Sequence, residues 1–136
     1  MLDLMSKLET PVASPVCSLG QITSARKVVG SIYIDDKVRD YIVHVVHASR
    51  NPRAYGLTEL APLIDYGASP RATLFLAVAA RAHAFLRHRA YVTPDDVKAM
   101  GLDVLRHRVI LTYRADAENI GPDALLQRIF EAVPVP

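Results

Sequence analysis

Cysteine is nearly absent from this chain of 136 residues, in which Cys17 is the single example. One cysteine cannot form an internal disulfide, and no histidine lies near it in the sequence to activate its thiol. The chain also lacks the cysteine pairs that are typical of structural zinc sites. We therefore expect a cytoplasmic protein from a reducing compartment.

Long apolar runs and a strong charge bias are also lacking. No apolar run approaches the roughly 20 residues that a membrane-spanning helix needs. The amino-terminal sequence MLDLMSKLET lacks the basic start and long apolar centre of a signal peptide. The formal net charge is only +2, with 51% apolar and 22% charged residues. This globular composition argues against a disordered chain and against a nucleic-acid-coating protein.

Familiar catalytic signatures are missing from the sequence. There is no GxxxxGK[ST] phosphate loop, no HExxH zinc motif, and no serine elbow or triad pattern. Five histidines are present, with His44 and His47 one helical turn apart and His83 and His88 in a later segment, but no carboxylate is placed as a third metal ligand. By itself the chain is not expected to hydrolyse a nucleotide or to bind a metal.

Helical periodicity is what the sequence does contain. Apolar residues recur at the i, i+3, i+4, i+7, i+8 spacing of one buried stripe after Asp35, which predicts a helix that ends before Pro52. The residues of this stripe are Val38, Tyr41, Ile42, Val45 and Val46. Further helices are predicted from Ser18 to about Val29, from Ser69 to about Arg89, from Thr93 onward and from Pro122 to Ala132.

The segment from Ser69 to Arg89 is almost continuously apolar or small, so we expect it to be the central and most buried helix, with Phe75 and Val78 on its main apolar side. Residues 51–67 form a connection that is too long for a tight turn, and RVILTY fits either a helix end or a short strand. Helices with short links predict one all-α domain, a small helical bundle.

Two helix starts of similar sequence carry opposite charges. TPDD places two carboxylates in the first turn, as the helix dipole favours, whereas SPRA has Ser69 as the cap, Pro70 as the first helical residue and then the cation Arg71. Arg71 could pair with a nearby carboxylate such as Asp65, or it could grip a phosphate beside free backbone N–H groups. The basic triplet RHR at 106–108 leaves a similar choice between a solvated helix end and a phosphate contact.

Three motifs give the sequence a family resemblance. They are GASPRA at 67–72, YVTPDDVK at 91–98 and VLRHRVIL at 104–111. In this order they resemble the carboxy-terminal helical lid of MoxR-type AAA+ ATPases, and the preceding DDKVRDYIVHVVHASR resembles a second helix of that lid. The resemblance implies a small helical bundle of the AAA+ lid type.

The resemblance also implies roles for individual residues. Arg71 would be the sensor-2 arginine, which contacts the γ-phosphate of ATP, and Gly67 and Ser69 would belong to the same nucleotide-binding motif. ATP and Mg²⁺ would be cofactors of the parent ATPase, whose Walker A, Walker B and sensor-1 residues are not in this chain. Residues 1–16 would then be a junction from the ATPase core, and residues 17–136 the lid.

The partners implied by the resemblance are the AAA+ core domain, neighbouring subunits of a ring, and a client protein that the ATPase remodels. The arginine could serve the nucleotide of its own subunit or that of a neighbour. No feature of the sequence names the client.

Two other classes of function remain open at this point. YVTPDDVKAM also resembles the segment that begins the last helix of histone folds. A net charge of +2 is, however, lower than a nucleic-acid-binding domain of this size usually carries. A helical protein-interaction domain is the second alternative, in which Arg71 would be only a surface ion pair. The interaction domain is distinguished from the lid by whether Arg71 is free at its helix end or satisfied by a carboxylate.

Overall fold

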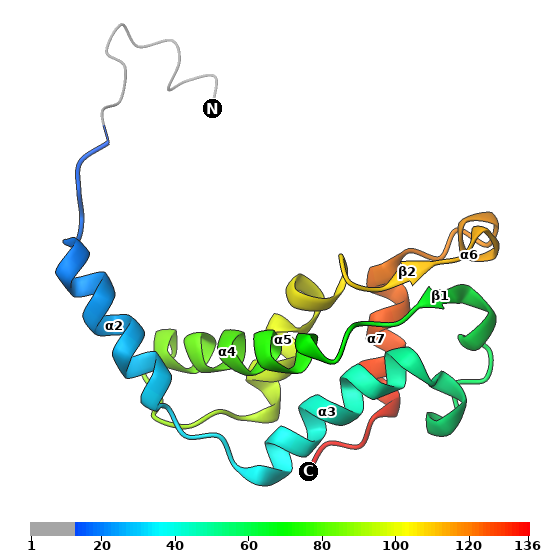
Figure 1. Cartoon of the computed structure of the whole chain (residues 1–136), viewed down its shortest axis with the longest axis horizontal. Helices are drawn as coiled ribbons and strands as arrows, with labels where there is room; N and C mark the ends of the chain where they lie inside the picture. The colour runs from blue at the N-terminus through cyan, green and yellow to red at the C-terminus, as the bar shows by residue number, and fades with distance from the viewer. Residues whose placement is uncertain (1–12) are drawn as a thin grey trace, which may run out of the picture.

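The computed structural model describes residues 13–136, so residues 1–12 of the expected junction lie outside the described part. Most of the described chain is helical, and no helix in it is long and apolar enough to cross a membrane. The predicted all-α bundle is confirmed (Figure 1). The α-helices are α2 (Leu19–Ser31), α3 (Asp36–Arg50), α4 (Arg71–Leu86), α5 (Pro94–Leu105), α6 (Tyr113–Ala117) and α7 (Pro122–Ala132).

The prediction that the Ser69–Arg89 segment forms the most buried helix is wrong, because α3 buries seven of its residues and α4 only four. Asp35 caps α3 by accepting a hydrogen bond from the Lys37 N–H at 2.9 Å, and the helix ends at Arg50, before Pro52. All five residues of the predicted apolar stripe are buried, and α3 packs against α4, α5 and α7. The amphipathic stripe therefore located both the helix and its buried face.

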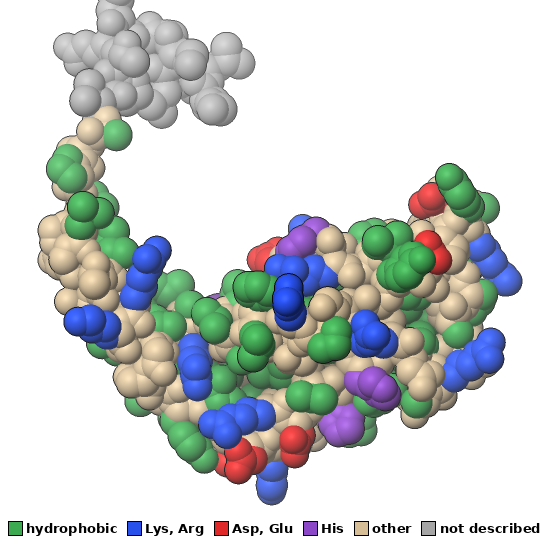
Figure 2. All heavy atoms as spheres, in the orientation of Figure 1, with side chains coloured by type: hydrophobic (Ala, Val, Ile, Leu, Met, Phe, Trp, Pro, Cys, Tyr) green, Lys and Arg blue, Asp and Glu red, His purple; other side chains and the backbone are tan. Residues whose placement is uncertain are grey.

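The buried face of α4 differs from the prediction. Its buried residues are Ala72, Leu76, Ala80 and Ala84. Phe75 and Val78 are instead 50% and 57% exposed, and Figure 2 shows apolar side chains at the surface over this part of the molecule. Three of these four residues are alanines, which let neighbouring helices approach closely, and α4 packs most extensively against α5. Leu76 is the one large side chain among these buried residues, whereas Leu74, Phe75 and Val78 are exposed.

Helix α2 begins with the predicted capping box. The Ser18 N–H donates to Gln21 Oε1 at 2.7 Å, and the Gln21 N–H donates to Ser18 Oγ at 3.2 Å. The helix ends at Ser31, two residues beyond the predicted end at about Val29. None of its residues is buried, and it extends from the body of the molecule beside α4 (Figure 1).

The connection between α3 and α4 contains short regular elements. Two 3-10 helices, η1 (Pro52–Tyr55) and η2 (Ala61–Leu63), lead into strand β1 (Ile64–Tyr66). This strand pairs antiparallel with β2 (Ile110–Leu111), and Tyr66 lies opposite Ile110. The ambiguous RVILTY segment is therefore a short strand, which holds the segment before α4 against the segment after α5.

Helix α5 runs without interruption through Gly101. A Cβ atom at Gly101 would lie 2.1 Å from Phe130 Cζ, a distance that real Cβ contacts do not show. The glycine thus makes room for the aromatic ring of α7. Its role is close packing between α5 and α7.

Candidate functional site

The start of α4 is fastened to the carboxyl end of α3. The fully buried Ser49 hydroxyl donates to the Val46 carbonyl at 2.7 Å and accepts from the Ala68 N–H at 3.0 Å. Arg50 Nη1 donates to the Ala68 carbonyl at 3.2 Å. Both backbone groups of Ala68 are therefore bound by α3, and this fixes the point from which the chain enters α4 at Arg71.

Gly67 is required by the same junction. A Cβ atom at this position would lie 2.3 Å from the Ser49 carbonyl oxygen and 2.6 Å from Arg50 Cα. Both obstacles are backbone atoms, which cannot move aside as a flexible side chain can. The glycine of GASPRA thus lets two backbones approach closely and sets the direction of α4.

Replacement of Gly67 by alanine is expected to destabilise the protein by about 1–3 kcal/mol, the usual range for overpacking. Gly30→Ala is the matched control, because Gly30 lies in α2 with no atom within 4 Å of a Cβ there. Alanine should leave stability unchanged or raise it by about 0.5–1 kcal/mol at that helical position. Urea unfolding of both variants measures the difference, and equal stabilities would contradict the close-approach role of Gly67.

The first turn of α4 uses its own backbone donors. The Arg71 N–H donates to Ser69 Oγ at 3.4 Å, the Ala72 N–H to the Ser69 carbonyl at 2.7 Å, and the Thr73 N–H to the Pro70 carbonyl at 3.1 Å. Pro70 has helical dihedral angles, although the helix proper begins at Arg71. The expectation of free backbone N–H groups beside the arginine is therefore wrong. Any anion contact at this turn falls to the side chains.

Arg71 itself is exposed at this turn. Within residues 13–136 its guanidinium makes no hydrogen bond or ion pair, and Asp65 does not reach it. The structure thus brings the predicted residues Gly67, Ser69 and Arg71 together in one short segment and leaves the cation free to bind an anion. The surface ion pair that the sequence left open does not form in the described part of the chain.

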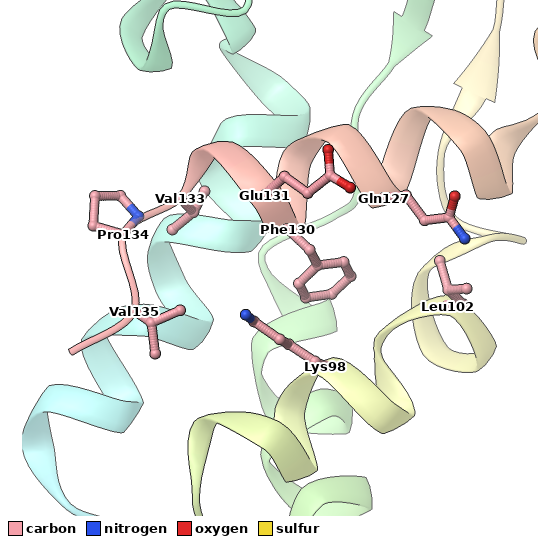
Figure 3. Close-up of a pocket in the computed structure, with 8 residues that line it drawn as sticks. All are labelled: Lys98, Leu102, Gln127, Phe130, Glu131, Val133, Pro134 and Val135. Carbon is pink, nitrogen blue, oxygen red and sulfur yellow. The ribbon is translucent and has the colours of Figure 1, made fainter.

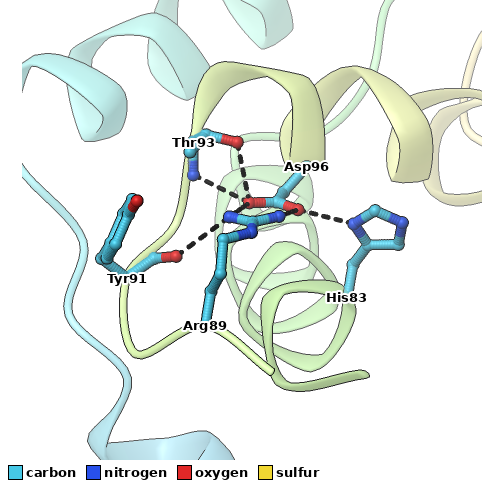
Figure 4. A network of polar contacts seen from close by, with 5 residues as sticks. All are labelled: His83, Arg89, Tyr91, Thr93 and Asp96. Atoms are coloured by element: carbon cyan, nitrogen blue, oxygen red, sulfur yellow. Dashed lines mark hydrogen bonds and ion pairs between the residues drawn. The ribbon is translucent and has the colours of Figure 1, made fainter. Parts of the chain in front are cut away.

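A second polar cluster joins the end of α4 to the start of α5 (Figure 4). The Asp96 side chain is fully buried and receives hydrogen bonds from both Nη atoms of Arg89, at 2.7 and 2.5 Å. It also accepts from the N–H and hydroxyl of Thr93, at 2.8 and 3.0 Å, and lies 2.6 Å from His83 Nδ1. The Asp96 carboxylate therefore connects α4, the loop that follows α4 and the start of α5.

The protonation of Asp96 follows from these contacts. Burial alone raises the pKa of this carboxyl, but the hydrogen bonds from Arg89, Thr93 and His83 outweigh burial and hold the pKa well below its usual range. Asp96 is thus a permanent anion at neutral pH. The T-x-x-D spacing is a capping-box signal that could have indicated its contact with Thr93, whereas the contact with Arg89 depends on the tertiary fold.

The histidines do not assemble a metal site in the described part of the chain. Nδ1 of His44 and Nδ1 of His47 both contact the Tyr55 hydroxyl, at 2.8 and 3.1 Å. His83 is engaged by Asp96. No group of three or more histidine, cysteine or acidic side chains in residues 13–136 is placed to hold a metal ion.

A hollow on another part of the surface lies between α5, α7 and the carboxy-terminal segment (Figure 3). Phe130, Leu102 and Val133 contribute apolar walls, and Lys98 and Glu131 add one charge of each sign. None of the three predicted site residues lines it. The start of α4 therefore remains the candidate functional site.

Comparisons with known proteins agree with this arrangement. The profile of the AAA lid domain family matches residues 57–129. The chain is 37% identical over 126 residues to chaperone MoxR1 of Mycobacterium tuberculosis, covering 93% of this chain and 33% of that protein. It is 34% identical over 124 residues to protein MoxR of Methylorubrum extorquens, covering 87% and 35% of the two chains.

The fold has a counterpart among solved structures. A crystal structure of a Cytophaga hutchinsonii protein assigned as an ATPase superposes with a TM-score of 0.83 at 37% identity, covering 86% of this chain and 36% of that one. The chain thus spans about a third of the length of these relatives. With a matching profile over more than half of its residues, the chain belongs to the AAA lid domain family and is a lid of the MoxR type.

Proposed function

We propose that this chain is the lid of a MoxR-type AAA+ ATPase and that Arg71 is its sensor-2 residue, which contacts the terminal phosphate of ATP. The observation that carries the proposal is the exposed guanidinium of Arg71, which has no partner among residues 13–136 and stands on a turn fixed by α3. A free arginine is well suited to grip phosphate oxygens through its fork of N–H donors.

Gly67 and Ser69 help to determine where the Arg71 side chain lies. Gly67 sets the backbone path, and the Ser69 carbonyl and hydroxyl oxygens accept the first N–H groups of α4. The Ser69 hydroxyl keeps its own proton and can donate it to a phosphate oxygen. These side chains fit one phosphate contact, whereas the base, most of the triphosphate and Mg²⁺ would be held by the ATPase core.

The lid would transmit the nucleotide state as a rigid body. The start of α4 is bound to α3, and its end is bound to α5 through Asp96. A displacement of Arg71 by the nucleotide would therefore move the whole bundle. Residues 17–136 would form this lid and residues 1–16 the junction to the core. Its partners would be the core domain and the neighbouring subunits of a ring, and the motion would drive chaperone-like remodelling of a client protein in the cytoplasm.

Steady-state ATP turnover by the intact ATPase carrying Arg71→Ala tests this proposal. Turnover should fall while subunit assembly and folding are preserved. Full turnover in a correctly assembled variant would remove the sensor-2 assignment and leave the chain as a helical packing domain.

A further inference from the structure

The two arginines of the RHR triplet have different surroundings. Arg106 is occupied by carboxylates, with Nε 3.1 Å from Asp123 and Nη2 3.5 Å from Asp103. Arg108 turns toward α4, where its Cζ lies 4.6 Å from the centre of the Phe75 ring. The triplet is therefore more than a solvated helix end, because Arg108 is held against the same helix that begins with Arg71.

The strand pairing places Arg108 beside the entrance to α4. Tyr66 lies opposite Ile110 in the antiparallel ladder. The chain leaves β1 at Tyr66 toward α4 and enters β2 at Ile110 shortly after Arg108, so both segments lie at the same end of the antiparallel pair. Arg108 thus approaches α4 from the end of the strand pair at which the chain enters α4.

The stacking on Phe75 brings the guanidinium close to the first turn. Phe75 follows Arg71 by four residues, and residues with this spacing are neighbours on one face of a helix. Helical side chains lean toward the amino end, so the half-exposed ring of Phe75 covers the turn that carries Arg71. Arg71 is therefore the helical neighbour of the residue on which Arg108 stacks.

Both guanidinium groups retain free donors. Arg108 uses Nε to donate to the Val104 carbonyl at 2.9 Å, and its Nη atoms make no hydrogen bond or ion pair with any residue in the described range 13–136. A guanidinium that lies over an aromatic ring keeps its N–H edge available for other partners. Two arginines without a carboxylate partner among the described residues thus lie at the same part of α4, one in its first turn and one on Phe75. An anion bound by both would relieve their repulsion.

We propose that Arg108 is a second phosphate-binding residue, which holds the polyphosphate chain of a nucleoside triphosphate together with Arg71 across the Phe75 ring. This inference rests on the proposed function of Arg71 and extends it to a second residue. Arg71 would reach the terminal phosphate, and Arg108 would bind the same or the adjoining phosphate.

The test measures MgATP turnover by the intact ATPase carrying Arg108→Met, which keeps a long apolar stem on Phe75 but removes the charge. We expect kcat/KM to fall about tenfold or more, since a hydrogen bond to a charged group contributes about 1.5–3 kcal/mol. Arg106→Met is the matched control from the same triplet, because Arg106 is already paired with carboxylates. Its kcat/KM should stay within about twofold of the starting protein.

A charge-preserving variant separates phosphate binding from packing. Arg108→Lys should retain more turnover than Arg108→Met if the charge is what matters. Equal losses in both variants, together with lowered melting temperatures, would assign Arg108 to packing and overturn the inference.

Arg71→Ala, measured in parallel, distinguishes the two proposals. Unchanged turnover for Arg108→Met beside a large loss for Arg71→Ala would overturn the role of Arg108 and leave that of Arg71 intact. Unchanged turnover for both variants would overturn both proposals. A double variant that loses less than the product of the two single losses would support a shared phosphate.

Discussion

ATP turnover by the intact ATPase of which this chain is the proposed lid is expected to fall by about a hundredfold or more when Arg71 is replaced by alanine. Arginines that stabilise the charge of a transferring phosphoryl group contribute on the order of 10³ to 10⁵ in rate, and a sensor residue at the low end of this range would still give a large loss. The measurement is steady-state hydrolysis over a range of MgATP concentrations, so that kcat and KM are obtained separately.

Arg87→Ala is the matched control for this experiment. Arg87 is an exposed arginine at the opposite end of α4, so its replacement removes the same charge from the same helix. We expect its turnover to remain within about twofold, as for most exposed charges. Equal losses for Arg71→Ala and Arg87→Ala would indicate a general effect of charge and would contradict a specific phosphate contact.

The second large effect is on stability. Asp96→Ala should lower the free energy of unfolding by about 3 kcal/mol, because removal of one partner from a buried ion pair leaves the other partners unsatisfied. This value is at the low end of the range for such changes, since Arg89 is partly exposed and can turn toward water. Urea unfolding of this chain measures the loss.

Asp95→Ala provides the comparison on the neighbouring carboxylate. Asp95 also lies in the first turn of α5, but it is exposed and does not join the cluster in Figure 4. Its replacement should remove only a favourable interaction with the helix dipole. Comparable losses for the two variants would contradict the central role of Asp96 between α4 and α5.

The low pKa of Asp96 also predicts a pH dependence. Because this pKa is lower in the folded state than the value of about 3.9 for an unfolded aspartate, the contribution of Asp96 is complete above that value. It declines as the pH falls toward the folded-state pKa. Between about pH 7 and about pH 3 the starting protein should lose about 1 kcal/mol more stability than Asp96→Asn, which cannot titrate there. Equal losses in urea unfolding at the two pH values would contradict this coupling.

The helices could be predicted from sequence where one face of the helix is clearly apolar. In α3 the large apolar residues all lie on one side, so the pattern identified both the helix and its buried stripe. In α4 nearly every face is apolar or small. The buried face consists of three alanines and Leu76, whereas Phe75 and Val78 are half-exposed. Hydrophobicity alone could not show which face of α4 is buried.

The candidate site was only partly accessible from sequence. The unusual charge of the SPRA helix start pointed to Arg71, and the structure leaves that arginine unpaired within the described residues. The anchoring by Ser49 and the stacking of Arg108 on Phe75 join segments that are far apart in the sequence. Local periodicity carries no information about such contacts, so they required the tertiary structure.

The central claim is that Arg71 contacts nucleotide phosphate, and the most direct test is a structure of the intact ATPase bound to Mg²⁺ and a non-hydrolysable ATP analogue. The account predicts an Arg71 guanidinium nitrogen at about 2.7–2.9 Å from an oxygen of the terminal phosphate, in the same or the neighbouring subunit. An Arg71 side chain that is paired with a protein carboxylate, or that points into solvent while the analogue occupies every subunit, would contradict it.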